Sequence, residues 1–401
     1  MSDVRFFPPK QNPGLVRLLQ SFTYLVVYFV YRIRLIISES DVAKAKAIAD
    51  ARAVYLPNHC TLDDGLVVFL LSARIGQMFH YVVALEAFQG IIGKLMQWVG
   101  AYSIRRGIGD RRSIVQTLKI LQQPQCKLVI FPEGGCSYQN DTVIPFRSGA
   151  VELSFKAMEK LVKQDGVVPD FYLVPVSLRY YYPGVTDVQI SQALSRLETA
   201  LSLDSKQDNN YLRLRAIAEQ VLINLETEYC LQPTVEVDWN QRIKQLKQKM
   251  LDYCEQKLNL SPAVNLPNRE RVYKVQSLLK TLPDRDKQAN LNYEHIYLTT
   301  VRLLNFDAIY DGYVAESPTP ERFIATIDRL EREVFQIDKP KHKGRCQAKL
   351  KIGDPINLKD HWQKYQLEQQ NGNVASQSAL SQSIINSITQ TVQRTVLANL
   401  K

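Results

Sequence analysis

A histidine and an aspartate stand five residues apart, directly after a short apolar run. Residues 58–64 read Asn-His-Cys-Thr-Leu-Asp-Asp, and residues 53–56 before them have the apolar character of a buried strand. A carboxylate that accepts a hydrogen bond from one imidazole nitrogen fixes the tautomer, and the other nitrogen can then take a proton from a hydroxyl. His59 and Asp64 are therefore the candidate catalytic pair, with His59 as general base.

Cys60 raises the alternative of a covalent acyl-enzyme intermediate. We disfavour it because a side chain adjacent to His59 in sequence is expected to point elsewhere. A base without a protein nucleophile suits direct attack of a substrate alcohol on a thioester.

A second segment, residues 100–107, is bounded by glycines and contains Arg105 and Arg106. The planar guanidinium group binds phosphate or carboxylate through two parallel hydrogen bonds. We expect these arginines, together with Arg147 in the segment Phe-Arg-Ser-Gly-Ala, to bind the substrate.

A third segment begins where the apolar run 127–131 leads into Pro-Glu-Gly-Gly-Cys. Glu133 brings a carboxylate, Gly134 and Gly135 allow a ligand to approach the main chain, and exposed N–H groups can stabilise an oxyanion. The simpler alternative for Glu133 is a loop carboxylate that caps the next turn. The apolar run 172–178 contains Pro175, which favours a place near a sheet edge or a strand end.

Strands and helices must bring these segments together. Apolar runs at residues 53–56, 81–85, 127–131 and 172–178 alternate with amphipathic stretches, which predicts an α/β layer with a largely parallel sheet. Open sheets of this kind bind ligands at the carboxyl ends of their strands. We expect the candidate residues to meet at that edge.

The pattern changes after residue 182. Residues 183–345 are mostly helical in pattern, and a strand signal returns at residues 348–352, before an amphipathic C-terminal helix. We predict a membrane-associating helix at 1–38, a catalytic core at 39–182, a helical insertion at 183–345, and the last core strand with the C-terminal helix at 346–401. No internal repeat is evident.

The N-terminal apolar segment is too short for an ordinary membrane span. Residues 18–31 carry no charge, whereas a spanning helix needs about 20 apolar residues. It is either a buried core helix or a helix in the membrane interface, with Tyr24, Tyr28 and Tyr31 at headgroup level. We expect the protein to be membrane-associated on the cytoplasmic face, without a cleaved signal peptide.

The amino-acid composition limits the kinds of partner that the protein is expected to bind. The net charge of +10 suits an anionic lipid surface, and no basic run with interleaved aromatic residues indicates nucleic acid. The six cysteines include no Cys-x-x-Cys pair, which predicts no zinc site and a reduced compartment.

These segments, in this order, resemble the glycerolipid acyltransferase family, which includes 1-acylglycerol-3-phosphate O-acyltransferases. The family's Asn-His-x-x-x-x-Asp is matched by Asn58, His59 and Asp64. Its Phe-Pro-Glu-Gly-Thr-Arg-Ser is matched at residues 131–134 and at Ser137. Its Gly-x-x-Phe-Ile-x-Arg is matched at Gly100, Ile104 and Arg106, its Val-Pro-Val strand at 174–176, and its late Gly-Glu-Pro-Ile by Gly-Asp-Pro-Ile at 353–356.

The resemblance implies a glycerolipid acyltransferase fold and transfer of a fatty acyl group from acyl-CoA or an acyl carrier protein to a lipid hydroxyl. It implies no cofactor and no metal. Arg106 and Glu133 would position the acceptor.

Two departures leave the acceptor open. Gly135 and Cys136 replace the family's Thr-Arg, and residues 84–86 lack a lysine that the family often has. The acceptor is a lysophospholipid if Arg105, Arg106 and Arg147 bind its phosphate, or a neutral lipid alcohol if they do not. A catalytically silent lipid-binding protein is the alternative from another class.

Overall fold

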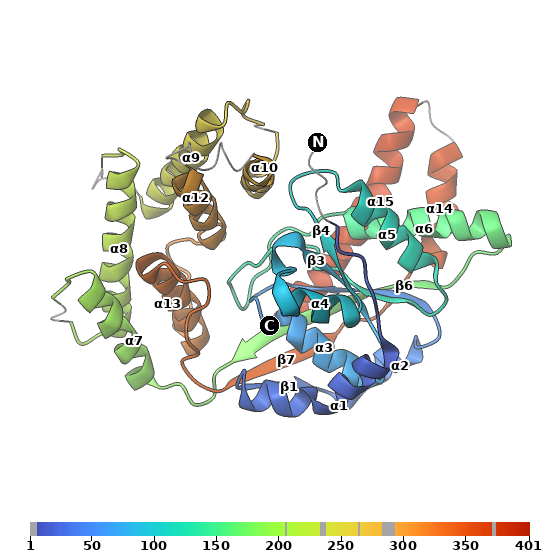
Figure 1. The fold of residues 1–401 in the computed structure, drawn as a ribbon, viewed down its shortest axis with the longest axis horizontal. Coiled ribbons are helices and arrows are strands. Elements are labelled where there is room, and N and C mark those ends of the chain that lie inside the picture. The colour runs from blue at the N-terminus through green and yellow to red at the C-terminus, as the bar shows by residue number, and fades with distance from the viewer. Residues whose placement is uncertain (1–5, 205–206, 233–237, 264, 283–292, 371–373) are drawn as a thin grey trace.

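The computed structural model describes residues 6–204, 207–232, 238–263, 265–282, 293–370 and 374–401, with side-chain positions left aside for residues 368–383. The chain has two parts, an α/β core and a group of helices formed by the middle of the sequence (Figure 1). Both termini belong to the core part.

One sheet of eight strands runs through the core. Its strands are β1 (Ile33–Ile37), β2 (Arg52–Pro57), β3 (His80–Ala84), β4 (Ala101–Ile104), β5 (Lys127–Val129), β6 (Phe171–Tyr181), β7 (Cys346–Ile352) and β8 (Ile356–Asn357). The order is β1-β7-β6-β2-β5-β3-β4, and β8 also pairs with β6. The pairs are parallel except β6–β7 and β6–β8, which are antiparallel.

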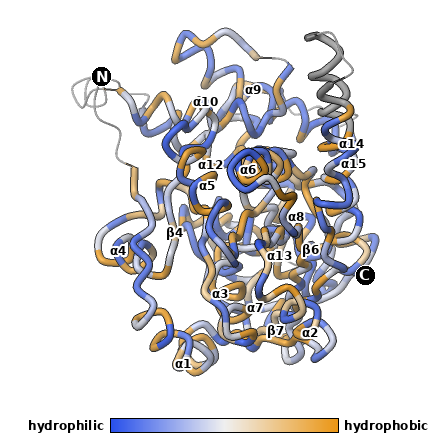
Figure 2. Tube along the Cα trace, turned by 90° about the vertical axis from the view of Figure 1, so that its right-hand side faces the viewer, coloured by the Kyte–Doolittle hydropathy of each residue, from blue (hydrophilic) through white to orange (hydrophobic). Residues whose placement is uncertain are grey.

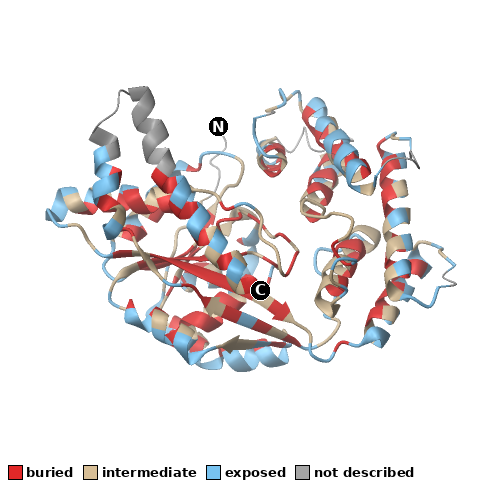
Figure 3. Ribbon diagram, turned by 180° about the vertical axis from the view of Figure 1, so that it is seen from behind, coloured by how far each residue is buried: buried red, intermediate tan, exposed pale blue. Residues whose placement is uncertain are grey.

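Side chains of the central strands alternate between two cores, as the two-residue period of a strand requires. In β2, Ala53 and Tyr55 join one apolar cluster, whereas Val54 and Leu56 join the other. The central strands β2, β5 and β6 are almost continuously buried (Figure 3).

Helices cover both faces of the sheet. The first cluster contains residues of α1 (Pro13–Phe29), α2 (Glu39–Ala47) and α3 (Asp64–Ile75). The second contains residues of α5 (Arg111–Gln122), α6 (Gly149–Asp165), α14 (Lys359–Gln370) and α15 (Val374–Leu400). A 3₁₀ turn (Leu85–Ala87) and α4 (Gly90–Trp98) connect β3 to β4. The predicted α/β fold with a mostly parallel sheet and a helical insertion is confirmed.

The placement of Pro175 near a sheet edge is wrong, because β6 lies in the middle of the sheet. The Pro175 carbonyl accepts from the Gly353 amide at 2.9 Å, on the side of the turn between β7 and β8. The nitrogen of a strand residue faces the same side as its carbonyl. The missing N–H of Pro175 therefore faces that turn and removes no bond to β2.

The N-terminal segment is only partly helical. α1 ends at Phe29, and Ile33–Ile37 forms β1, which pairs in parallel with β7. Residues 6–38 thus combine a helix with an outer strand of the sheet. Among the described residues no helix is long and apolar enough to cross a membrane.

The helical part lies between β6 and β7. Its helices are α7 (Asp187–Ala200), α8 (Asn210–Glu228), α9 (Trp239–Lys257), α10 (Asn268–Thr281), α12 (Tyr293–Asn305) and α13 (Pro320–Phe335). It has an apolar core of its own, to which α7, α8, α9, α12 and α13 all contribute.

A repeated ion pair joins consecutive helices of the insertion. Buried arginine forks bind buried glutamates of the preceding helix in the pairs Arg213–Glu198, Arg242–Glu226 and Arg271–Glu255, with Nη2–Oε2 distances of 2.6, 2.7 and 2.6 Å. Each arginine is the fourth residue of its helix, and each glutamate is the third from the end. The insertion therefore contains an internal helical repeat, and the expectation of none is wrong. Each unit of the repeat is marked only by one glutamate and one arginine, and the sequence between them varies. The repeat is therefore hard to recognise without the structure.

Candidate active site

His59 and Asp64 lie together at the carboxyl end of β2. His59 follows the strand by two residues, and Asp64 is the first residue of α3. The Nδ1 atom of His59 is 2.7 Å from Oδ2 of Asp64. The His59 side chain is 20% exposed and that of Asp64 is fully buried. This geometry leaves Nε2 of His59 available to exchange a proton with a partly accessible site.

Three further donors hold the buried Asp64 carboxylate. The Thr61 amide donates to Oδ2 at 3.0 Å, the Thr61 hydroxyl to Oδ1 at 3.1 Å, and the Tyr180 hydroxyl to Oδ1 at 2.5 Å. Hydrogen bonds to both oxygens hold the carboxylate in a fixed orientation.

The charge of the His59 ring depends on opposed effects. Burial lowers the pKa of His59, but the neighbouring Cys136 sulfur and the Asp64 carboxylate outweigh it and raise that pKa well above its usual value. The site therefore stabilises the imidazolium, which is the form that a base takes after it has accepted a proton.

The loop after β5 holds the backbone of His59. Glu133 Oε1 accepts from the His59 amide at 2.7 Å, and the Ser137 amide donates to the His59 carbonyl at 2.7 Å. The second oxygen of Glu133 accepts from the Ile144 amide at 3.0 Å. Both carboxylate oxygens of this buried residue thus bind main-chain N–H groups. Burial raises the pKa of Glu133 to about 7, against the effect of these donors.

Asn58 anchors the same turn to the neighbouring strand. Its side-chain amide donates to the Leu178 carbonyl at 3.0 Å and accepts from the Leu178 amide at 2.7 Å. Cys60 is buried, and its sulfur accepts from the Asn58 side chain at 3.0 Å. Cys60 therefore faces β6 and not the imidazole ring.

Cys136 is the cysteine beside the base. Its sulfur lies 3.3 Å from Nε2 and 3.6 Å from Nδ1 of His59. Near-equal distances to both nitrogens place the sulfur over the ring face, because an atom in line with the Nε2 lone pair is much farther from Nδ1. The sulfur therefore does not occupy the in-plane direction of Nε2.

The predicted substrate arginines separate into two groups. Arg105 pairs with Asp110, whose side chain also caps α5. Arg106 and Arg147 instead face Tyr273 of α10, with guanidinium carbons 4.4 and 5.8 Å from the ring centre. A Cβ at Gly134, which has φ +72°, would overlap the Arg147 guanidinium. Gly134 therefore allows Arg147 to lie against the loop.

Contacts from the insertion reach the same loop. The Tyr273 hydroxyl donates to the Gly134 carbonyl at 3.1 Å, Arg269 donates to the Cys136 carbonyl at 3.1 Å, and Arg329 donates to the Ser137 carbonyl at 2.6 Å. Residues 134–137 thus lie between His59 on one side and the insertion on the other.

Sequence reasoning missed Tyr180, Tyr273 and Arg269. Tyr180 stands 116 residues from Asp64, and Tyr273 stands 139 residues from Gly134. No local pattern marks contacts of this separation. The alternation of β6 could have placed Tyr180 on the same face as Leu178, but not beside Asp64.

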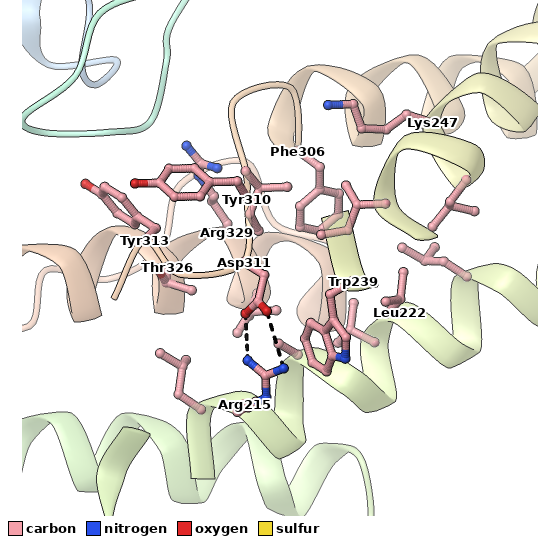
Figure 4. A pocket seen from close by; sticks show the side chains of 18 of the residues that line it. Arg215, Leu222, Trp239, Lys247, Phe306, Tyr310, Asp311, Tyr313, Thr326 and Arg329 are labelled. Carbon is pink, nitrogen blue, oxygen red and sulfur yellow. Dashed lines mark hydrogen bonds and ion pairs between the residues drawn. The ribbon is translucent and has the colours of Figure 1, made fainter. Parts of the chain in front are cut away.

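One pocket borders this hydrogen-bonded centre and another lies away from it. One borders the turn after β2 and is lined by Cys60, Thr61, Leu62, Tyr180 and residues of α13, with about 850 Å³ of empty space partly open to solvent. The other lies inside the insertion and encloses about 990 Å³, also partly open. Figure 4 shows its apolar walls and the ion pair between Arg215 and Asp311, at 2.6 Å.

In the described parts of the chain no group of three or more His, Cys, Asp or Glu side chains is arranged to hold a metal ion. The site consists of a histidine base, a buried carboxylate, main-chain N–H groups and arginines. Such a site is suited to proton transfer and to stabilising negative charge.

The pair thus lies at the carboxyl edge of a mostly parallel α/β sheet. Residues 38–179 match the sequence model of the Acyltransferase family and form an acyltransferase domain. This confirms the resemblance from the sequence motifs. A search of curated proteins finds no match to the chain.

Proposed function

We propose that the protein transfers a fatty acyl group from a thioester donor to the hydroxyl of a glycerolipid acceptor such as a lysophospholipid. The observation that carries the proposal is the 2.7 Å contact between Nδ1 of His59 and Asp64, inside the acyltransferase domain. It leaves Nε2 to act on the acceptor hydroxyl. Acyl-CoA or an acyl carrier protein is the donor.

The proton and the acyl group move in two steps. Nε2 of His59 takes the acceptor proton while the oxygen attacks the thioester carbonyl, and Asp64 stabilises the imidazolium that forms. The tetrahedral intermediate then expels the thiolate, which takes the proton from the imidazolium. The products are the new ester and a free thiol, and His59 is neutral again.

Main-chain N–H groups near His59 can stabilise the oxyanion. The amides of Gly135 and Cys136 have no hydrogen-bond partner among the described residues, whereas the neighbouring amides of Gly134 and Ser137 are bonded. Donors already directed at the developing charge are the most effective form of such stabilisation. Glu133 contributes by fixing the His59 main chain.

An exposed apolar surface supports a lipid acceptor. α1 buries Val16, Gln20, Thr23 and Val27, whereas Leu25 and Phe29 are 59% and 72% exposed. The face that α1 turns outward is thus apolar, unlike the polar outer face usual for a surface helix. We propose that α1 lies in the interface of an anionic membrane, on its cytoplasmic face.

α4 extends this surface. Its Ile91 and Ile92 are 82% and 68% exposed, and the segment leading into α1 bonds to its end through Asn12 and the Trp98 carbonyl at 2.9 Å. Figure 2 shows apolar residues in both helices. Exposed apolar groups in one region are typical of membrane contact.

One transfer assay tests the proposal. The purified chain and His59→Ala are incubated with labelled acyl-CoA or acyl carrier protein and with lysophosphatidate, lysophosphatidylglycerol or monoacylglycerol. We expect acyl ester from the wild type only. Product from His59→Ala at the wild-type rate, in a variant with an unchanged unfolding temperature, would defeat the mechanism. If the wild type acylates monoacylglycerol alone, the acceptor is a neutral lipid alcohol and not a lysophospholipid.

A further inference from the structure

Helix α10 of the insertion packs directly against the catalytic loop. Tyr273 is 2% exposed, and its hydroxyl donates to the Gly134 carbonyl and accepts from Arg106 Nη1, both at 3.1 Å. A Cβ at Gly135 would lie 2.1 Å from this hydroxyl, and one at Gly107 would lie 2.3 Å from the Tyr273 main chain. Both glycines are therefore needed to seat α10.

Arg269 stands one helical turn before Tyr273 and has an unused donor. Its Nε pairs with Asp307 at 2.7 Å, and its Nη2 donates to the Cys136 carbonyl at 3.1 Å. Its Nη1 is buried and has no hydrogen-bond partner in the described parts of the chain. That atom would lie 2.8 Å from a Cβ at Gly135, so the unused donor is at the catalytic loop.

Arg106 shows the same pattern from the core side. Its Nη1 binds the Tyr273 hydroxyl, and its Nη2 lies 3.5 Å from a carboxylate oxygen of Glu86. Its Nε is buried without a partner among the described residues. Two guanidinium groups, one from each part of the protein, thus carry unpaired N–H groups near the Tyr273 hydroxyl.

Ion pairs surround these donors without using them. Arg106, Arg147, Arg269 and Lys280 lie near the carboxylates of Glu86, Glu270 and Asp307, and Glu133 also interacts electrostatically with Arg269. Buried donors without partners are costly, and donors on guanidinium groups are best satisfied by phosphate or carboxylate oxygens. The Cys136 main chain links Arg269 to the site, since the Cys136 sulfur touches His59.

We propose that α10 completes a phosphate-binding subsite next to His59, in which Arg269 and Arg106 donate to the phosphate and the Tyr273 hydroxyl positions Arg106. This subsite rests on the proposed acyl transfer, and it restricts the substrates of that reaction to molecules that carry a phosphate group. Arg269 supplies from the insertion a guanidinium that the Gly135-Cys136 segment lacks. Gly135, without a side chain, leaves the space that Tyr273 and Arg269 occupy.

The phosphate can arrive on the lipid acceptor or on the CoA part of the donor. The kinetics of Arg269→Gln separate these two sources. One comparison uses 1-acylglycerol 3-phosphate and monoacylglycerol as acceptors. The other uses acyl-CoA and an acyl-pantetheine thioester without phosphate as donors. Loss of a hydrogen bond to a charged group should raise the KM of the phosphorylated substrate about tenfold. The KM of its phosphate-free counterpart should not change.

Three further variants control the experiment. Lys274→Gln removes a charge from an exposed side chain of the same helix and should leave both KM values unchanged. Arg269→Lys retains the charge and should recover part of the affinity. The double variant Arg269→Gln with Asp307→Asn removes both partners of the ion pair. It shows whether an unpaired Asp307, and not the lost guanidinium, changes the KM. Thermal unfolding of each variant reports on folding.

A KM shift on the acceptor assigns the subsite to the acceptor phosphate, and a shift confined to acyl-CoA assigns it to the donor. Equal effects of Arg269→Gln on phosphorylated and phosphate-free substrates, or effects no larger than those of Lys274→Gln, would overturn the subsite. Calorimetric binding of glycerol 3-phosphate against glycerol tests it without turnover. If the wild type binds the phosphate through Arg269 but transfers to no acceptor, the proposed function fails and the subsite stands.

Discussion

Tyr180 donates its hydroxyl proton to Asp64 Oδ1 at 2.5 Å, while His59 occupies the other oxygen of the same carboxylate at 2.7 Å. The catalytic carboxylate is therefore held between a histidine from the adjacent turn and a tyrosine from the central strand β6. Burial, with Asp64 nearby, raises the pKa of Tyr180 far above its usual value, so its hydroxyl remains a donor.

Tyr180→Phe should lower kcat about tenfold, because a hydrogen bond to a buried charged group contributes roughly 1.5–3 kcal/mol. KM should change little, since Tyr180 acts through Asp64. Steady-state kinetics of the acyl transfer provide the measurement. Tyr181→Phe, at the next and more exposed position of the strand, is the matched control. Equal kcat values for the two variants would contradict this role.

The pH dependence of transfer should reflect the raised pKa of His59. The base must be neutral to accept a proton, so the rate should rise with pH through a pKa above the usual histidine range. Cys136→Ala removes one neighbour that raises this pKa, so the acid limb should move to lower pH. The pH profile of kcat measures both effects, with exposed Cys230→Ala as control. If the acid limb of Cys136→Ala moved to higher pH, Cys136 would not be raising the pKa of His59.

Glu133→Gln should destabilise the fold as well as reduce transfer. Each Glu133 oxygen accepts from a main-chain amide, so the new NH₂ group must face the amide of His59 or of Ile144. A buried donor left without an acceptor costs about 1–3 kcal/mol. Chemical denaturation measures the loss, and Glu152→Gln, in an exposed i,i+4 pair with Lys156, should cost far less.

The repeated ion pairs predict a specific stability pattern in the insertion. Arg242→Met should cost about 3–5 kcal/mol because it leaves buried Glu226 unpaired. The double change Arg242→Met with Glu226→Leu should recover most of that loss, since neither charge then remains buried. Unfolding of the single and double variants gives the comparison. A double variant no more stable than the single one would show that the loss comes from packing.

The sequence predicted the parts of the site that depend on short separations. His59 and Asp64 are five residues apart, at the end of a strand whose apolar run is plain. β1 was not predicted because Ile33–Ile37 continues the apolar character of α1. β4 was not predicted because it has only four residues, directly after Gly100. Neither carries enough alternation to mark a strand.

The long-range half of the site had no local signal. Arg269 and Tyr273 lie in a helix whose sequence explains only its amphipathic packing. Their approach to residues 134–136 depends on how the whole insertion packs on the core. The sequence shows that residue 135 is a glycine. Only the structure shows why, because the Tyr273 hydroxyl occupies the space that a side chain at residue 135 would take.

Membrane association should depend on the outward face of α1. Leu25→Glu with Phe29→Glu replaces two exposed apolar side chains without touching the buried contacts of Val16, Gln20 and Val27. Each side chain buried in the interface contributes roughly 1.5–3 kcal/mol, so co-sedimentation with anionic vesicles should fall at least about tenfold.

A deletion of residues 1–38 is the less informative variant, because it also removes β1 from the sheet. The matched control is Val167→Glu with Val188→Glu, two side chains that are 68% and 61% exposed outside α1 and α4. This control should bind vesicles as the wild type does. If both double variants lose binding equally, added negative charge alone explains the loss, and α1 is not the membrane contact.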